Sequence, residues 1–155
     1  MKINTYQNQG ITEDRVDIYY KEINIEIEGI LTYLNENQRK IIGFNNDEKY
    51  VLNIKDIYYF DTVDKKSFAY LKEAVYQVQY SLYELEASCS SFGFVRINKS
   101  MIVNIYKVSC IKSSINMKLK IQLDNNEMLI ISRHYKKVFE NKLEEIKNEL
   151  IGGNK

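Results

Sequence analysis

Two short stretches of the chain combine cationic and hydrogen-bonding side chains with residues typical of a buried core. In the first, residues 94–104, Asn98, Lys99 and Ser100 lie between apolar residues. The second is residues 132–137, SRHYKK. Asn and Lys carry donors that can contact base edges, and a Ser hydroxyl can bind a phosphate oxygen. The two stretches therefore predict a surface for a phosphate-rich partner.

The charge distribution points to the same region. Residues 94–137 hold nine lysines and arginines and two acids, which gives this region +7 in a chain whose total is +1. Residues 1–93 carry −5 and residues 138–155 carry −1. A local basic face of this kind is the electrostatic footprint of a phosphate-rich partner.

The second stretch has an unusual charge pattern for the start of a helix. We expect Ser132 to cap a helix whose first turn holds Arg133, His134, Lys136 and Lys137. The helix dipole disfavours cations at this end, by roughly a few tenths of a kcal/mol each. Helix N-termini with added cations bind phosphate groups. The alternative interpretation is that Lys136 and Lys137 are only solvated.

Composition limits the class of protein. The chain has 155 residues, 45% of them hydrophobic, with six glycines and no proline, which suits one domain with a small appendage. No apolar run approaches the roughly 20 residues needed to span a membrane, and the N-terminus lacks an apolar signal segment. We expect a cytoplasmic protein in which Cys89 and Cys110 stay reduced.

The sequence offers little for catalysis. It contains no G-x-x-x-x-G-K-[ST] and no G-x-G-x-x-G, and its single histidine is His134. One histidine is too few for most histidine-based metal sites, and nothing nearby supports a Cys89–His134 nucleophile pair. We therefore predict no enzyme activity, no metal and no cofactor.

The first 44 residues predict a small α/β extension. We expect a short strand over residues 2–8, a polar turn over 9–14 and a second strand over 15–20. Isoleucines at 23, 25 and 27 alternate as in a strand, while those at 23, 27 and 30 fit a helical stripe. The pattern is long and Glu-rich, so we predict a helix over about residues 22–36.

From Arg39 onward, short apolar stretches alternate with polar turns, as in an antiparallel sheet. We predict a mostly β (α+β) fold of small antiparallel sheets with few helices, in which residues 1–44 form the extension and residues 45–151 the main domain. The expected strands are 40–44, 49–52, 57–63, 67–72, 75–79, 94–97, 101–103, 108–113, 118–123 and 128–131. The expected helices are 82–88 and 133–150.

The order of four segments resembles the LytTR DNA-binding domain of bacterial response regulators. They are YYFD at 58–61, LYEL at 82–85, FVRINKSMIVN at 94–104 and ISRHYKK at 131–137, and the resemblance covers about residues 49–150. It implies a mostly β domain whose loops, rather than a recognition helix, enter successive major grooves of bent double-stranded DNA. The implied targets are paired direct repeats upstream of promoters.

Carried over by position, the resemblance predicts three DNA-facing loops: residues 64–67, 98–100 and 133–134. Here the first loop is shorter than in the family, and His134 stands where many members have a second arginine. Base contacts are expected from Lys99 and Arg133, with His134 as a secondary, pH-dependent contact. Arg96 is expected to support the corner or to contact phosphate. The remaining predicted DNA-binding residues are Lys65, Lys66, Ser67, Asn98, Ser100, Lys136 and Lys137.

About 45 residues precede the domain, too few for a receiver, so the chain resembles short stand-alone LytTR regulators. That resemblance implies a homodimer at least on DNA and a small membrane protein as a regulatory partner. The extension would serve dimerisation or that partner. The alternative from another class is a protein-interaction regulator that acts on a membrane or signalling partner without specific DNA binding.

Overall fold

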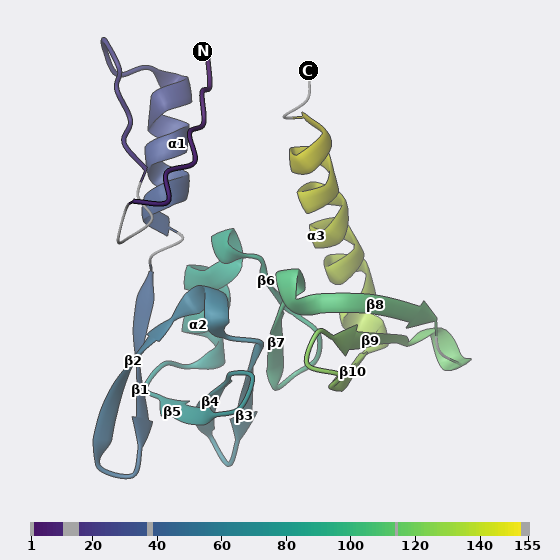
Figure 1. The fold of residues 1–155 in the computed structure, drawn as a ribbon. Coiled ribbons are helices and arrows are strands. Elements are labelled where there is room, and N and C mark those ends of the chain that lie inside the picture. The colour runs from purple at the N-terminus through teal and green to yellow at the C-terminus, as the bar shows by residue number, and fades with distance from the viewer. Residues whose placement is uncertain (1, 11–15, 37–38, 114, 153–155) are drawn as a thin grey trace.

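A seven-stranded antiparallel sheet is the largest element of the fold. The computed structural model describes residues 2–10, 16–36, 39–113 and 115–152 (Figure 1). The strand order in the sheet is β2-β1-β5-β4-β3-β7-β6. The strands are β1 (Lys40–Asn45), β2 (Glu48–Asn53), β3 (Tyr59–Val63), β4 (Lys66–Tyr70), β5 (Val75–Val78), β6 (Phe94–Arg96) and β7 (Met101–Asn104).

A smaller sheet and three helices complete the described chain. The small sheet has the order β10-β9-β8 and is also antiparallel. Its strands are β8 (Val108–Ser113), β9 (Leu119–Leu123) and β10 (Met128–Ile131), and the helices are α1 (Ile25–Glu36), α2 (Leu82–Cys89) and α3 (Arg133–Gly152). The expected mostly β class with few helices is confirmed, and each strand predicted from residue 40 onward is present to within two residues at either end.

The large sheet is covered on both faces because its strands alternate two sets of apolar side chains. On β3, Phe60 packs with Phe94 and with side chains of α2 in a first core. The neighbouring Tyr59 belongs to a second core, together with Ile131 of β10 and Phe139 of α3. Phe60, Ile131 and Phe139 are fully buried. The small sheet and α3 are therefore held to one face, and α2 to the other.

The N-terminal strands predicted over residues 2–8 and 15–20 are wrong. Residues 2–10 and 16–24 form no strand, and residues 11–15 lie outside the described chain. Alternation alone does not make a strand, since the segment needs a hydrogen-bonding partner. The predicted helix is present but begins at Ile25, because the Asn24 side chain accepts from the backbone N–H groups of Glu26 and Ile27 at 3.1 and 3.0 Å.

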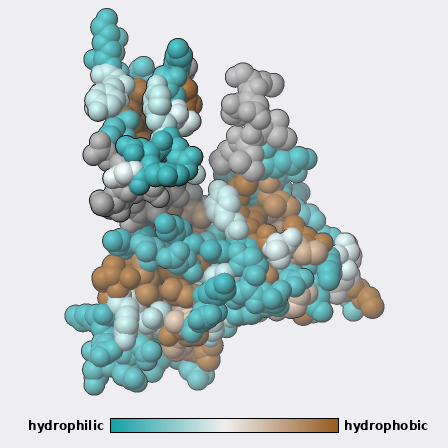
Figure 2. Space-filling model, viewed as in Figure 1, coloured by the Kyte–Doolittle hydropathy of each residue, from teal (hydrophilic) through white to brown (hydrophobic). Residues whose placement is uncertain are grey.

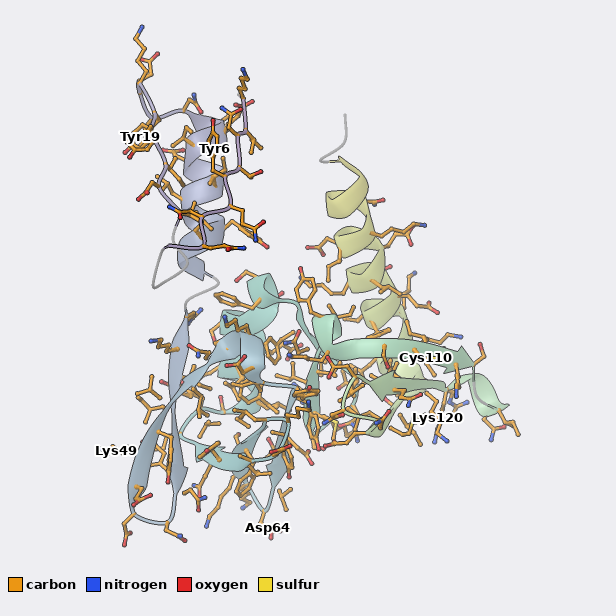
Figure 3. All side chains as sticks on the ribbon, viewed as in Figure 1. Tyr6, Tyr19, Lys49, Asp64, Cys110 and Lys120 are labelled. Atoms are coloured by element: carbon orange, nitrogen blue, oxygen red, sulfur yellow. The ribbon has the colours of Figure 1, made fainter. Side chains whose placement is uncertain are left out.

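We call residues 2–36 the N-terminal unit. It carries several exposed apolar side chains, which are visible over α1 in Figure 2. Tyr6, Tyr19 and Ile25 are 88, 91 and 86% exposed. Figure 3 shows Tyr6 and Tyr19 away from both sheets. The unit therefore contributes little to either core.

The strand at residues 40–45 was expected to belong to the N-terminal extension. It instead pairs with β2 along its whole length and with β5 at Gly43 and Phe44. The main sheet thus begins at Lys40, and the boundary drawn at residue 44 cuts through a hairpin. The backbone N–H of Ile54 also donates to the Arg39 carbonyl at 3.0 Å, which ties the start of this strand to the domain.

Candidate nucleic-acid interface

The first of the three loops is the tip of the β3–β4 hairpin. Val63 pairs with Lys66, so the turn consists of Asp64 and Lys65 alone. Both have positive φ, +49° and +64°. This is the backbone of a two-residue type I′ turn, for which Asn-Gly and Asp-Gly are favoured. Lys65, which is exposed, therefore occupies the second turn position, where glycine would adopt the same backbone without strain. Figure 3 shows Asp64 at the outermost point of this hairpin.

The structure changes the role expected of Ser67. Its side chain is only 5% exposed, and its Oγ lies 3.5 Å from the Oγ1 of Thr62 on the neighbouring strand. The two-residue turn puts Lys66 opposite Val63 and Ser67 opposite Thr62, and Ser67 then points to a buried face of the sheet. The prediction that Ser67 faces DNA does not fit this burial, whereas Lys65 and Lys66 are exposed.

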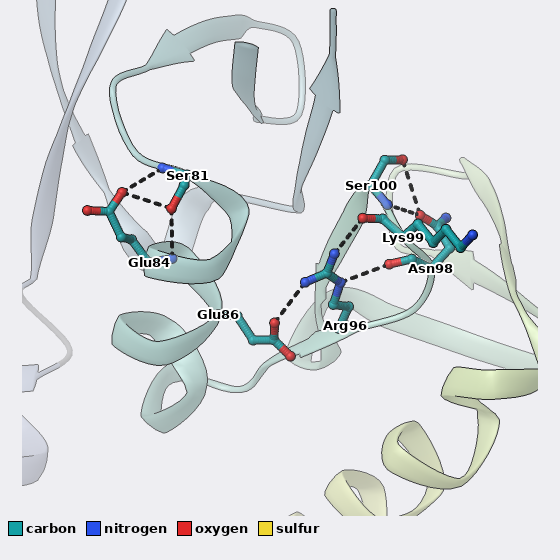
Figure 4. Close-up of polar contacts among 7 residues, drawn as sticks. All are labelled: Ser81, Glu84, Glu86, Arg96, Asn98, Lys99 and Ser100. Carbon is teal, nitrogen blue, oxygen red and sulfur yellow. Dashed lines mark hydrogen bonds and ion pairs between the residues drawn. The ribbon is translucent and has the colours of Figure 1, made fainter. Parts of the chain in front are cut away.

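The second loop is the corner between β6 and β7, and its own side chains define its shape (Figure 4). The Oδ1 of Asn98 accepts from the backbone N–H of Ser100 at 2.8 Å and from its hydroxyl at 3.2 Å. Lys99, between them, is exposed. The corner therefore presents the Lys99 side chain outward, while Asn98 and Ser100 hold the turn.

Arg96 supports the corner from behind. Its Nε donates to the Asn98 carbonyl at 3.1 Å, and its Nη2 donates to the carbonyl of Lys99. Its Nη1 forms a 3.0 Å ion pair with Glu86, and its guanidinium lies over the Tyr135 ring, 5.9 Å from the centroid. Of the two roles expected for Arg96, its contacts in this structure match support of the corner.

Glu86 is positioned by the start of its own helix. Ser81 caps α2 by accepting from the backbone N–H of Glu84, and the Glu84 side chain accepts in return from the Ser81 backbone N–H at 2.8 Å. These bonds lower the pKa of Glu84, the backbone N–H of Ser81 being the main cause. Leu82 and Leu85 are buried and hold the helix against the first core. A capping box and an apolar stripe thus hold the carboxylate that pairs with Arg96.

The third loop is the start of α3. The backbone N–H of Tyr135 donates to the Ser132 carbonyl at 3.0 Å, which closes the first turn. Arg133 and His134 are exposed there, and the turn contains no acid. Phe139, one turn further, is fully buried. The helix start is therefore anchored in the second core while its cations face solvent. Lys137 is exposed, and Lys136 is half-buried.

Backbone hydrogen bonds join the three loops. The N–H of Thr62, next to the hairpin tip, donates to the Ser100 carbonyl at 2.9 Å. The N–H of Ser132 donates to the Ile97 carbonyl, also at 2.9 Å. The corner is therefore bonded to the hairpin on one side and to the helix start on the other. The structure brings Lys65, Lys99 and Arg133 together on one bonded framework.

A tyrosine pair fixes the small sheet against the large one. The Tyr58 hydroxyl donates to Asp124 in the β9–β10 turn, which raises the pKa of Tyr58 to about 12. Tyr59 stacks on Tyr70 with ring centroids 4.4 Å apart, and burial together with a hydrogen bond to Glu127 raises its pKa further. Sequence reasoning missed this pair and Glu86, because no local pattern links them to their partners, and Asp124 follows Tyr58 by 66 residues.

The described residues carry no cluster of metal ligands and no disulfide bond. No group of three or more His, Cys, Asp and Glu side chains there could hold a metal ion. Both cysteines are free, and burial raises the pKa of the Cys89 thiol. No helix in the described ranges is long and apolar enough to cross a membrane.

Known proteins resemble this chain both in sequence and in fold. Over 145 residues it is 27% identical to a Staphylococcus aureus (strain NCTC 8325) protein named as an uncharacterized HTH-type transcriptional regulator. The match covers 92% of this chain and 98% of the relative. A protein of the same name from strain MRSA252 is 26% identical over the same length. Because each match covers 92% of this chain, it includes part of the N-terminal unit as well as the sheets.

A solved structure has the same fold. It is the LytTr DNA-binding domain of a Bacillus cereus protein described as a methyl-accepting/DNA response regulator, with a TM-score of 0.64 and 24% identity. The match covers 67% of this chain and 95% of that one. The model of the LytTr DNA-binding domain matches residues 47–144, well over half of the chain and all three loops. This chain therefore belongs to the LytTR family of DNA-binding domains.

Proposed function

We propose that the protein is a sequence-specific transcriptional regulator whose three loops enter successive major grooves of direct-repeat sites. The observation that carries this proposal is the bonded framework of the loops. Each loop presents an exposed cation, and backbone hydrogen bonds join the corner to the other two. Rigidly spaced loops can match the fixed spacing of grooves along a duplex, and their cations supply the phosphate attraction on which affinity depends.

The exposure of each side chain and its bonds within the protein suggest which residues contact DNA and which shape the loops. We assign base contacts to Lys99 and Arg133, with His134 beside them. Phosphate contacts are assigned to Lys65, Lys66, Lys136 and Lys137. We assign Arg96, Asn98 and Ser100 to the shape of the corner, since their polar groups already bond within it. Ser67 is left out because it is buried.

The experiment is binding of the purified chain to the intergenic DNA upstream of its own gene. An excess of unrelated duplex serves as competitor, and footprinting locates the site. We expect specific retention and protection of two repeats in phase, with one protomer on each. Retention that disappears with competitor would contradict the proposal. A regulator of this kind acts on chromosomal DNA, so we place it in the cytoplasm as a homodimer on its site.

A second candidate function, protein interaction, is favoured by the N-terminal unit. Tyr6, Tyr19 and Ile25 expose apolar surface there without contributing to either core. Exposed apolar groups of this kind mark interaction sites. The unit would bind a second protomer or a regulatory partner, which the resemblance to stand-alone regulators suggests is a small membrane protein.

Sedimentation of the full chain with and without Tyr6→Ser and Tyr19→Ser tests self-association through this unit. We expect a concentration-dependent dimer that the substitutions weaken. A monomer at every concentration would assign the surface to another partner. If the chain also failed to retain its upstream DNA specifically, protein interaction would be the better-supported function of the protein.

A further inference from the structure

Two lysines lie directly opposite each other on the outer face of the small sheet. Lys112 of β8 is the register partner of Lys120 of β9, and both side chains are exposed. Opposite residues of an antiparallel pair have Cβ atoms about 4.5–5.5 Å apart, and like charges there are destabilising. The pair therefore weakens the free sheet, and an anion lying against both side chains would remove the repulsion.

No acid of the small sheet neutralises this pair. Neither lysine makes an ion pair within the described ranges. The two acids of the sheet, Asp124 and Glu127, lie at the β9–β10 turn, at the other end of β9 from Lys120. Asp124 accepts from the Tyr58 hydroxyl, and Glu127 accepts from the Asn125 side chain at 3.0 Å. The positive charge of the outer face is therefore left for a partner outside the chain.

A register row joins the pair to β10, the strand that precedes the third loop. Lys120 is also the register partner of Ile130 on β10, only three residues before Arg133. A single row thus crosses the sheet from Ile130 through Lys120 to Lys112. In Figure 3, Lys120 lies on the small sheet, away from the C-terminal end of α3. The row therefore leads from the strand that precedes the helix start to the outer strand of the small sheet.

We propose that Lys112 and Lys120 bind a phosphate of the DNA backbone just beyond the groove occupied by the third loop. The proposal rests on the DNA-binding function and extends its footprint. Two strand spacings carry the row about 10 Å outward from β10. The duplex rises about 3.4 Å per base pair, so the added contact covers about three base pairs on one flank. Contacts to phosphate position the protein and carry no sequence information.

The test compares two double variants with equal loss of charge. One is Lys112→Gln with Lys120→Gln. The control is Lys55→Gln with Lys72→Gln, two exposed lysines just before β3 and just after β4, at the strand ends opposite the hairpin tip. Binding to a duplex of unrelated sequence is measured over a range of salt concentrations. We expect the first variant to bind more weakly and to lose about 1 from the slope of log K against log salt, because one phosphate contact is removed. The control should keep the wild-type slope.

The outcomes separate this proposal from the proposed function. If the wild type binds no duplex at all, DNA binding itself fails. If the wild type binds and the two double variants behave alike, this inference is overturned while DNA binding stands. Thermal melting checks the fold, and because a repelling pair is removed, the Tm of the first variant should equal or exceed that of the wild type.

Hydroxyl-radical footprinting on the upstream intergenic DNA gives an independent readout. We expect wild-type protection about three base pairs beyond the third-loop contact, on that flank alone, and its loss in the Lys112→Gln, Lys120→Gln variant. A wild-type footprint that ends at the third loop would overturn the proposal even if the salt slope had changed.

Discussion

The backbone N–H of Ser132 donates to the carbonyl of Ile97 at 2.9 Å, so the last residue before α3 is bonded to the first residue of the β6–β7 corner. Because this bond uses no side chain, the spacing of the corner and the helix start belongs to the fold rather than to the DNA-facing residues. Lys99 and Arg133 can therefore vary without moving each other, and the losses from substituting them should add.

Replacing Arg96 by lysine tests its role as a positioning residue. Lysine keeps the charge but cannot reach the Asn98 and Lys99 carbonyls and Glu86 together. Hydrogen bonds to charged groups contribute about 1.5–3 kcal/mol, so we expect specific affinity to fall about tenfold to a hundredfold. Gel shifts over a range of salt should show an unchanged slope, since no phosphate contact is lost.

Arg39→Lys is the matched control for this substitution. Arg39 also donates to a carbonyl, that of Ser88 at 2.7 Å, and lies over the Phe92 ring, 5.6 Å from its centroid, but touches no DNA-facing loop. Its substitution should leave DNA affinity unchanged. Equal losses in the two variants would mean that Arg96 acts through general stability rather than through the corner.

Lys99→Ala and Lys137→Ala should have different effects. A base contact at Lys99 contributes about 1–3 kcal/mol of discrimination, so its loss should relax specificity at one operator position. A phosphate contact at Lys137 acts on all sequences, so its loss should weaken binding uniformly and reduce the salt slope by about 1. Both side chains are exposed, which limits effects on folding. Gel shifts with operator variants over a range of salt concentrations measure both effects. If the two variants lose the same affinity for every sequence, Lys99 and Lys137 do not have separate roles.

The main sheet could be predicted because its strands are short, apolar and separated by turn residues. The N-terminal strands could not, since alternation at residues 16–20 looks the same whether or not a partner strand exists. The helix start at Ile25 depends on a cap by Asn24, a local signal that the prediction passed over in favour of a longer apolar stripe.

The exposed cations of the site could be found from the sequence, but the groups that hold them could not. Arg96 bonds to Glu86 of α2, and no local pattern links the two. The burial of Ser67 follows from the two-residue turn, because a turn one residue longer would reverse which face each residue of β4 occupies. Side-chain roles that depend on register or on distant partners need the fold.

Tyr58→Phe should reveal the bond between the two sheets through its pH dependence. The pKa of Tyr58 is raised from 10.0 to about 12 by its hydrogen bond to Asp124. The folded protein holds this proton more tightly than the unfolded chain, so the contribution is full below pH 10 and is lost as the pH rises through about 12. We expect the substitution to cost about 1–2 kcal/mol at neutral pH.

Urea unfolding at pH 8 and at about pH 12 measures this difference. The gap in unfolding free energy between wild type and Tyr58→Phe should shrink at the higher pH. Tyr83→Phe on α2 is the control, because Tyr83 is 78% exposed and its loss should cost little at either pH. A gap that stays constant with pH would show that Tyr58 stabilises the protein by packing alone.

Lys65→Gly separates the folding role of the hairpin tip from its binding role. Lys65 has φ +64°, a conformation that costs an L-residue about 1 kcal/mol and glycine almost nothing. We therefore expect the variant to be more stable by up to about 1 kcal/mol, yet to bind DNA more weakly with a salt slope reduced by about 1. Asn46→Gly in the β1–β2 turn, at φ +53°, relieves a similar conformation without removing charge and should leave binding unchanged.

Thermal melts and salt-dependent gel shifts measure stability and DNA binding of the Lys65→Gly and Asn46→Gly variants on the same samples. If the variant gains stability but keeps its DNA affinity and salt slope, the hairpin tip lies away from the phosphates. If it gains stability and loses affinity, the strained lysine is retained for contact with DNA.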